Sequence, residues 1–151
     1  HSEMTQYRPA TLADVVTVSR NLRADDLREV EGLGYSRKDV PFSYLISEVC
    51  VYFYDKDDSP AGVAGVVREG VFGKIWMLCT DVIHNEPIKF VRQAKSWIKS
   101  IEKDYQLLYN VVDTRNTVHH KLLKHLGFKA LSVQHLGPDH LPYYEIVKLC
   151  A

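Results

Sequence analysis

Residues 116–128 read NTVHHKLLKHLGF and follow the apolar run LLYNVVD at residues 107–113. A near-continuous apolar run of this length is typical of a strand that is buried on both faces. Residues 117–126 are then predicted to form a short helix. It ends at Gly127, because glycine readily adopts the left-handed conformation that follows many helices. Another apolar run predicts a strand at residues 129–135. This sequence of strand, short helix and strand decides the fold.

The longest predicted helix lies upstream, at residues 87–104. Pro87 suits its first position, because the N–H that proline lacks would have no helical partner there. Apolar residues recur in this segment with a period of 3.6, with Trp97 beside them, and they predict one buried face. These residues are Ile88, Val91, Ala94, Ile98 and Ile101.

The chain opens with a strand and three predicted helices. The strand ends at residues 7–9, since the residue before a proline is pushed to extended geometry. Thr11 and Asp14 have the spacing of a capping box. The three helices are predicted at residues 11–22, 25–31 and 38–47. Val40, Tyr44 and Leu45 are expected to face inward from the third.

Between these helices and the long one, three β-rich runs predict an antiparallel meander. They lie at residues 49–54, 61–68 and 74–80, and a last strand is predicted at residues 143–149. The complete order predicts an α+β fold, with a mixed, mostly antiparallel sheet flanked by helices. We expect a single domain over residues 4–151, with residues 1–3 before Met4 as an expression remnant.

Composition excludes several classes of protein. The 151 residues carry no net charge, with 19 basic and 19 acidic side chains, and 46% are apolar. This apolar content is too high for a disordered chain, and the neutral balance argues against a nucleic-acid-binding protein. No apolar run approaches the roughly 18 residues of a membrane helix, and no secretory signal is visible. We therefore expect neither a membrane nor a nucleic acid as partner, and no secretion.

Cysteines and histidines give no strong motif. The three cysteines, Cys50, Cys79 and Cys150, show no CxxC spacing, which favours a reduced, intracellular setting and packed core thiols over nucleophiles. The helix at residues 117–126 carries three histidines without the i, i+4 spacing of a metal-binding helix. We therefore expect no metal site.

The element order and residues 116–128 together resemble the GNAT acyltransferase family. In that family a strand is followed by an asparagine, a short helix and a Gly-Phe pair that opens the next strand. Asn116 and the pair Gly127-Phe128 match this spacing. The opening Arg8-Pro9-Ala10-Thr11 is similar as well. The resemblance covers nearly the whole chain and implies a GNAT-like fold.

Within the family, the chain looks most like the short GNAT-like proteins of tailed bacteriophages, a group that includes an internal virion protein of T7-like phages. Arg23-Ala24-Asp25-Asp26, followed by Glu29-Val30, supports this grouping. The resemblance implies a location in the cytoplasm of a bacterial host or in the virion, with a host or virion protein as a possible partner.

GNAT enzymes transfer an acetyl group from acetyl-CoA to an amine, so the resemblance implies a loop that holds the pyrophosphate. The matching loop contains Val82 and Ile83 and leads into the long helix, whose N-terminus favours an anion. In the family this loop is glycine-rich, yet no glycine occurs here between Gly73 and Gly127. Lys89 and Arg92 could supply phosphate-binding charge instead, or they could belong to a solvated basic helix face.

The resemblance also implies a strand whose backbone pairs with the pantetheine arm of the cofactor. This position is occupied by Met77, Leu78, Cys79 and Thr80, and the following strand is expected to splay away from them over residues 110–113. The alternative is that residues 74–80 form an ordinary core strand. Asn116 is the residue most readily carried over from the family pattern. Its amide could contact the cofactor arm or cap the helix that follows.

Proton transfer requires an acid and a base. The position that often carries a tyrosine acid in the family is Leu123, which cannot donate a proton. Asp81 and Asp113, at the ends of two predicted strands, are candidate bases, or they simply cap turns. His119 could act as acid or base near neutral pH, or it could fill the site.

Two functions follow from these patterns. The first is an acetyl-CoA-dependent N-acyltransferase, phage-encoded, acting on an amine of a protein or of a small molecule. The second is a non-catalytic GNAT-fold phage protein that acts by binding, as a virion component or as a modulator of a host factor. The missing loop glycines and Leu123 favour the second. A small-molecule sensor that uses the same slot is a third possibility.

Overall fold

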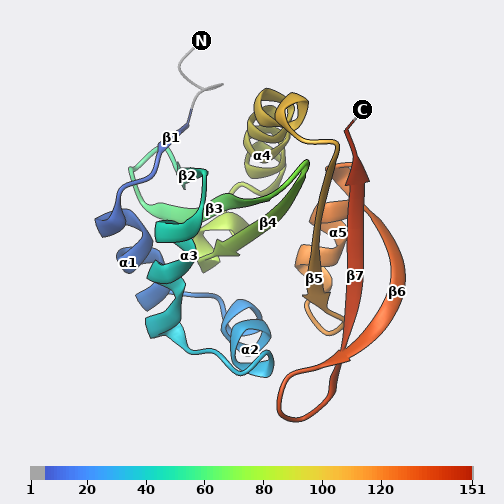
Figure 1. Cartoon of the computed structure of the whole chain (residues 1–151). Helices are drawn as coiled ribbons and strands as arrows, with labels where there is room; N and C mark the ends of the chain where they lie inside the picture. The colour runs from blue at the N-terminus through green and yellow to red at the C-terminus, as the bar shows by residue number, and fades with distance from the viewer. Residues whose placement is uncertain (1–5, 151) are drawn as a thin grey trace.

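The computed structural model describes residues 6–150, so the expected expression remnant at residues 1–3 lies outside the described part. Seven strands form one sheet in the order β1-β2-β3-β4-β5-β7-β6 (Figure 1). Only the β4–β5 pair is parallel. The predicted α+β fold with a mixed, mostly antiparallel sheet is thereby confirmed. The strands are β1 Tyr7–Pro9, β2 Val49–Tyr54, β3 Pro60–Glu69, β4 Phe72–Cys79, β5 Leu107–Asp113, β6 Lys129–Leu136 and β7 Leu141–Leu149.

Helices cover both faces of the sheet. The α-helices are α1 Leu12–Arg20, α2 Ala24–Gly32, α3 Val40–Ile46, α4 Pro87–Ile101 and α5 Thr117–His125. Short 3₁₀ turns occupy Arg37–Asp39 (η2), Asp81–His84 (η3) and Glu102–Asp104 (η4). Among the helices of residues 6–150, none combines the length and the apolar character that a membrane span requires.

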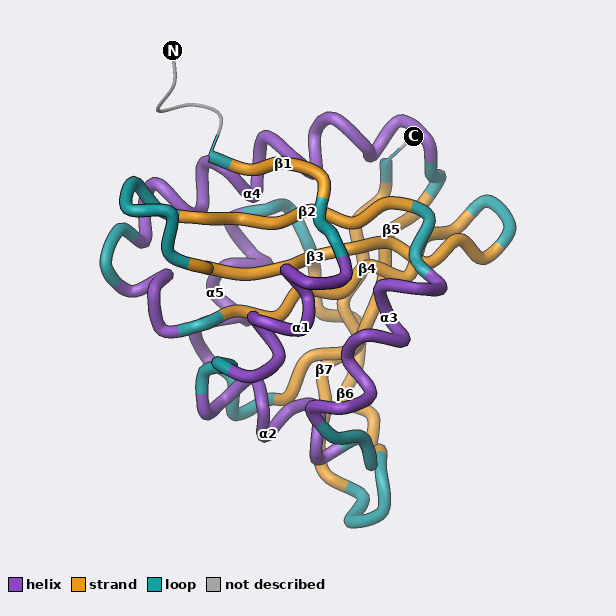
Figure 2. Tube along the Cα trace, turned by 90° about the vertical axis from the view of Figure 1, so that its left-hand side faces the viewer, coloured by secondary structure: helices purple, strands orange, loops and turns teal. Residues whose placement is uncertain are grey.

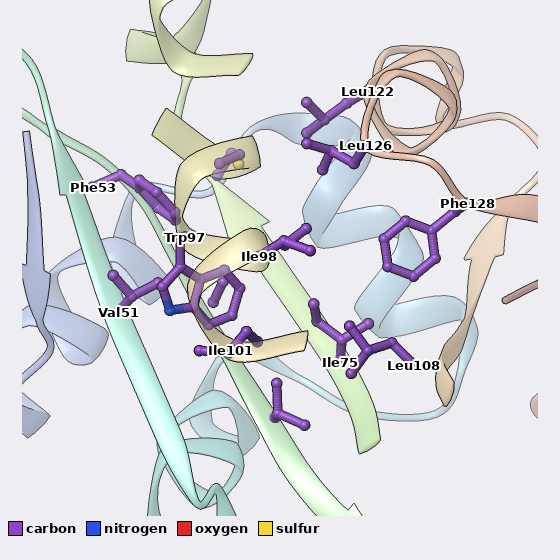
Figure 3. Close-up of a cluster of buried hydrophobic side chains, with 14 of the residues drawn as sticks. Val51, Phe53, Ile75, Trp97, Ile98, Ile101, Leu108, Leu122, Leu126 and Phe128 are labelled. Carbon is purple, nitrogen blue, oxygen red and sulfur yellow. The ribbon is translucent and has the colours of Figure 1, made fainter. Parts of the chain in front are cut away.

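The core has two parts, one on each side of the sheet. On one side α4 and α5 pack against the strands, and Phe53 of β2 meets Phe90 and Trp97 of α4 edge to face. Figure 3 shows Phe53 beside Trp97 in this cluster. On the other side, Val15 and Val18 of α1 pack with residues of α3, β2, β3 and β4. Figure 2 views the molecule with α1 and α3 in front of the first strands.

Two predicted inward-facing residues are exposed instead. Ile88 is 71% exposed, because at 100° per residue it lies about half a turn away from the buried Trp97 on α4. Leu45 is 63% exposed, because it lies roughly 140° around α3 from Val40, the one fully buried residue of that helix. The rest of each predicted stripe is confirmed, because Ala94, Ile98 and Ile101 of α4 and Val40 of α3 are buried and Tyr44 packs against the core.

The feature that positions the site is the divergence of β4 and β5. These strands pair only where Phe72–Lys74 meets Leu107–Tyr109. They lie close together near the top of Figure 1 and separate toward their carboxyl ends. The Asn110 side chain donates to the carbonyl of Ile75 at 2.5 Å, just beyond the last pair. The predicted splaying of β5 from β4 is confirmed, and we call the gap between them the wedge.

Candidate functional site

The wedge exposes one edge of β4. In an antiparallel pair, backbone groups alternate between pointing at the partner strand and pointing away. Thr80 N–H donates to Ala61 of β3, so Leu78 also faces β3, while Cys79 and Met77 face the wedge. The Cys79 backbone is already paired: its N–H donates to Asp26 Oδ2 at 2.7 Å, and its carbonyl accepts from Arg23 N–H at 2.9 Å. Met77 is therefore the point at which the β4 edge is open.

A buried ionic network closes the wedge beyond Met77. Arg23 and Asp26 lie one turn apart at the start of α2, and their side chains pair at 2.6 Å although both are almost fully buried. Arg23 Nε also donates to His84 Nε2 of η3 at 3.1 Å. A buried ion pair of this kind is tolerated only where the remaining polar groups are satisfied. Here α2, through Arg23 and Asp26, links β4, η3 and α5.

Asn116 joins this network from the start of α5. Its Nδ2 donates to Asp26 Oδ1 at 3.0 Å, and its Oδ1 accepts from Arg23 and from the backbone N–H of His119, both at 3.4 Å. Asn116 therefore caps α5, one of the two roles expected for it. It is fully buried, and the described contacts engage both ends of its amide.

His119 and Cys79 lie at the second carboxylate oxygen of Asp26, Oδ2, whereas Arg23 and Asn116 bond to Oδ1. His119 Nε2 is 3.2 Å from Asp26 Oδ2, and Cys79 has no exposed surface. Burial alone would lower the pKa of His119, but the Asp26 carboxylate holds that pKa well above its ordinary value. Burial raises the pKa of the Cys79 thiol, so the thiol is protonated rather than nucleophilic in this setting.

Glu29 and Asp113 are two further titratable groups beside this network. Glu29 lies one turn after Asp26 on α2, and its carboxylate accepts from the backbone N–H of Asp113 at 2.7 Å. Burial raises the pKa of Glu29 to about 7. Burial also acts to raise the pKa of Asp113, but Arg115, which reaches both Asp113 oxygens, holds it below its usual value. Glu29 is thus the carboxyl that titrates near neutral pH.

The loop between β4 and α4 uses its own amides internally. Thr80 Oγ accepts from Val82 N–H at 3.2 Å, and the Thr80 carbonyl accepts from Ile83 N–H at 3.4 Å. Ile83 is buried in the core. In this conformation neither predicted amide is free to bind a phosphate.

The first turn of α4 lies beside a hollow of about 480 Å³, which Lys89 and Arg92 line together with Glu86. No side chain caps this helix within the described part of the chain, and Lys89 Nζ is 3.9 Å from the Glu86 carboxylate. An anion could bind the two basic groups here, against the opposing charge of Glu86. The hollow opens along α4, and none of the network residues lines it.

The structure brings together only some of the residues predicted from the sequence. Cys79, Asn116 and His119 meet at Asp26, and Asp113 lies next to them through Glu29. Asp81 is separate, with a side chain that is 83% exposed at the start of η3. Leu78 packs against α1.

Sequence reasoning missed three residues that complete the site, the N-cap of α2 and two residues within that helix. Arg23, Asp26 and Glu29 follow one another at intervals of three, so they form one stripe of the helix. A charged stripe normally faces solvent, and this one is buried. The spacing of these charged residues is visible in the sequence, but it is the same as the spacing on a solvent-exposed helix face.

Comparison with known proteins is informative at the level of structure. No family model matches the sequence, and no curated protein does. A GNAT-family acetyltransferase from Streptococcus pneumoniae is 15% identical with a TM-score of 0.68, over 95% of this chain and 97% of its own. A spermidine N-acetyltransferase SpeG chimera from Vibrio cholerae and hSSAT is 11% identical with a TM-score of 0.66, over 97% and 96%.

A GNAT-superfamily phosphinothricin acetyltransferase from Sinorhizobium meliloti, in complex with AcCoA, is 13% identical with a TM-score of 0.68, over 95% of this chain and 86% of its own. All three likenesses extend over nearly the whole of this chain, and identities this low establish architecture rather than activity. Together with the strand order and the divergence of β4 from β5, they show that this chain has the GNAT fold.

Proposed function

We propose that the protein is an N-acyltransferase that uses acetyl-CoA to acylate an amine. The observation that carries the proposal is the wedge, with the Met77 N–H and carbonyl facing it. The pantetheine arm of CoA contains amide groups, which pair with a strand edge as another strand would. Met77 offers one such donor and acceptor, between Ile75 and Cys79, whose carbonyls are already bonded.

The residues fit the two ends of acetyl-CoA unequally. The arm fits the β4 edge at Met77, and Cys79 would need to give up its bonds to α2 for the pairing to extend further. At the phosphate end, Val82 and Ile83 offer no free amide, and Lys89 and Arg92 would supply the charge. Acetyl-CoA would bring the activated acyl group, and the chain would orient it and handle protons.

Proton handling in this proposal falls to the carboxyl and imidazole groups at the wedge. A general base works best when its pKa is near the working pH, and the Glu29 pKa of about 7 meets that condition. Asp113 lies next to Glu29, and His119 lies next to Asp26. The charges of Asp113 and His119 would both influence the pKa of Glu29. Asp81, which was also a candidate base, would act only from the exposed start of η3.

The acceptor in this proposal is a primary amine. The solved neighbours include proteins named for spermidine and phosphinothricin, which favours a small-molecule amine as the first acceptor to test. The resemblance to short phage proteins adds a host or virion protein as a second acceptor, and the host cytoplasm or the virion as the location. The side chains described at the wedge do not distinguish a small-molecule amine from an amine of a protein.

A second candidate is a non-catalytic binding protein with the same fold. The specific observation in its favour is that Arg23 and Asp26 occupy the Cys79 backbone and engage both ends of the Asn116 amide. In this reading the chain's own α2 takes the place of the cofactor arm, and the wedge is a structural joint.

Thermal melting and calorimetry with acetyl-CoA and CoA test the first proposal. A ligand at one hundred times its Kd stabilises the folded state by about 2.7 kcal/mol. For a domain of this size that corresponds to a rise in Tm of roughly 5–10 °C. Release of free thiol from acetyl-CoA in the presence of spermidine would then report transfer. If millimolar acetyl-CoA leaves both the Tm and the calorimetric baseline unchanged, the acyltransferase is excluded and the binding protein stands.

A matched pair of double variants locates the phosphate end. Lys89→Ala with Arg92→Ala removes the two basic groups of the hollow, while Lys95→Ala with Lys99→Ala removes two exposed lysines of the same helix. The first pair should weaken binding and reduce its dependence on salt, and the second should do neither. Equal effects would show that the phosphates bind elsewhere.

A further inference from the structure

Three side chains with metal-binding atoms meet at the buried end of the wedge. Asp26 Oδ2, Cys79 Sγ and His119 Nε2 all lie within 4.8 Å of one another. They come from α2, β4 and α5, which are far apart in sequence, so no spacing motif could reveal them. All three residues are buried. Carboxylate oxygen, thiolate sulfur and imidazole nitrogen are the donors that zinc takes in proteins.

His119 supplies an independent observation. Its Nε2 is buried and has no hydrogen-bond partner among the described residues. Asp26 Oδ2 is 3.2 Å away, which is close enough for a hydrogen bond, but the direction is wrong for one. His119 thus has an ionic partner in Asp26 but no well-directed hydrogen bond to it. A buried polar atom without a hydrogen bond requires an explanation, and an unfilled coordination position is one.

The distance between these two atoms fits shared coordination. Zinc bonds of about 2.0–2.2 Å to nitrogen and oxygen, at a tetrahedral angle, place two such ligands roughly 3.4 Å apart. The observed 3.2 Å between His119 Nε2 and Asp26 Oδ2 is close to that value. The sulfur lies within 4.8 Å of the other two atoms, and a zinc–sulfur bond of about 2.3 Å would place it about 3.6 Å from them. Metal binding therefore draws the sulfur inward by up to about 1.2 Å.

The groups around Asp26 support the same role. Arg23 and Asn116 both bond to Oδ1 of Asp26, which leaves Oδ2 facing His119, with only the Cys79 N–H bonded to it. Ligating carboxylates in metal sites are commonly held in this way by hydrogen bonds to their other oxygen. The orientation of Asp26 is therefore fixed before any ion binds.

We propose that Asp26, Cys79 and His119 form a binding site for one divalent transition-metal ion, with Zn²⁺ as the ion that suits their oxygen, sulfur and nitrogen donors. Cys79 binds as the thiolate and His119 as the neutral imidazole, so the thiol proton of Cys79 and the Nε2 proton of His119 both leave to solvent as the metal–sulfur and metal–nitrogen bonds form. The bound ion joins α2, β4 and α5 at the buried end of the wedge. It thereby cross-links the two halves of the sheet where backbone pairing between β4 and β5 has ended.

Cobalt is the probe for this site, because Co²⁺ replaces Zn²⁺ and its thiolate complexes absorb in the near ultraviolet and the visible. The full chain is freed of metal with a chelator, unfolded, and refolded with Co²⁺, since a buried site fills most readily during folding. We expect a thiolate-to-cobalt absorption band that saturates at one ion per chain, loss of the band on addition of Zn²⁺, and a higher Tm with either ion.

Variants assign the band to its residues. Cys79→Ser should abolish it. The double variant Cys50→Ser with Cys150→Ser should retain it in full, which tests Cys79 without altering the site. His119→Ala should weaken metal binding at least tenfold, while its neighbour change His120→Ala should leave it unchanged. Absence of the band in the refolded wild type, or its loss in the Cys50/Cys150 double variant, would overturn the proposal. Neither result would bear on acetyl-CoA binding.

Discussion

Asp26 has no exposed surface, yet the described contacts give each of its oxygens at least two polar neighbours. Burial acts to raise the pKa of its carboxyl, and the nearby His119 and Arg23 reverse this and hold the pKa below its usual value. Loss of one partner from such a network costs more than loss of a surface ion pair, because the charges that remain are buried. The network therefore fixes how α2 and α5 sit at the wedge.

Asn116→Ala tests the strength of this joint. The change removes a helix cap, worth about 1 kcal/mol, and takes one buried hydrogen-bond partner from each of Asp26 and Arg23, at about 1–3 kcal/mol more. We expect the free energy of unfolding to fall by about 2–4 kcal/mol in urea denaturation. Thr11→Ala removes the exposed cap of α1 and should cost about 1 kcal/mol. Equal losses in the two variants would mean that the buried contacts of Asn116 contribute nothing.

Glu29 predicts a specific dependence of stability on pH. Its pKa is about 7 in the folded chain and 4.5 in the reference state. Below pH 4.5 the carboxyl is protonated in both states and imposes no penalty. As the pH rises from 4.5 to 7, the unfolded chain releases the proton and the folded chain keeps it, so the folded state loses stability. A gap of about 2.5 between the two pKa values corresponds to roughly 3 kcal/mol.

Glu29→Gln removes this titration and keeps an oxygen that accepts from Asp113 N–H. We therefore expect the variant to lose less stability than the wild type between pH 4.5 and 7, as measured by urea unfolding at a series of pH values. Glu31→Gln, at an exposed position of the same helix, should follow the wild-type curve. A Glu29→Gln curve that parallels the wild type across this window would contradict the raised pKa.

Some residues of the site could be predicted from the sequence, and others could not. Asn116 and His119 could be singled out through the family resemblance, which assigns roles to positions at fixed offsets from a strand end and from Gly127-Phe128. Arg23, Asp26 and Glu29 could not be, because charged residues three apart on a helix are usually solvated. Their burial depends on where α2 docks, which is a tertiary contact.

At the scale of elements, local patterns were sufficient for nearly every helix and strand. β5 and the start of α4 lie where the sequence predicts them, since Pro87 and a continuous apolar run mark their limits. The predicted third helix is divided into η2 and α3, with Pro41 in the first turn of α3. Periodicity does not show where the buried stripe of a helix ends, so it places Ile88 and Leu45 on the stripe although both are exposed.

The orientation of α4 can be tested with two isoleucines of the same helix. Ile98 is 3% exposed and packs in the core with Trp97, whereas Ile88 is 71% exposed. We expect Ile98→Ala to cost about 2–5 kcal/mol of unfolding free energy and Ile88→Ala less than about 0.5 kcal/mol, as measured by chemical denaturation. A comparable loss at Ile88 would mean that a partner surface covers the start of α4.

At the scale of the whole molecule, the sequence predicts the class of sheet, but residue patterns alone do not predict its wedge. The strand order places β7 between β5 and β6, and β4 pairs with β5 over three residues only. Register between strands that are distant in the chain depends on long-range packing, which periodicity does not contain. The expectation that β5 splays from β4 came from the family resemblance.

The wedge makes a prediction about individual backbone amides. Leu78 N–H bonds within the sheet, Cys79 N–H bonds to Asp26, and Met77 N–H faces the gap. Amides that lack a partner and can reach water exchange their hydrogen without any opening of the structure. In hydrogen exchange followed by NMR, we therefore expect the Met77 amide to exchange at least about a hundredfold faster than those of Leu78 and Cys79.

The same experiment separates the two functions proposed for the fold. If acetyl-CoA binds along β4, the Met77 amide gains a partner, and its exchange should slow toward that of its neighbours. Leu78 should change little, because β3 already pairs with it. If acetyl-CoA leaves Met77 exchanging at its original rate while binding elsewhere, the arm does not use this edge. Slow exchange of Met77 in the free protein would mean that another group of the chain already fills the wedge, and the acyltransferase proposal would lose the observation on which it depends.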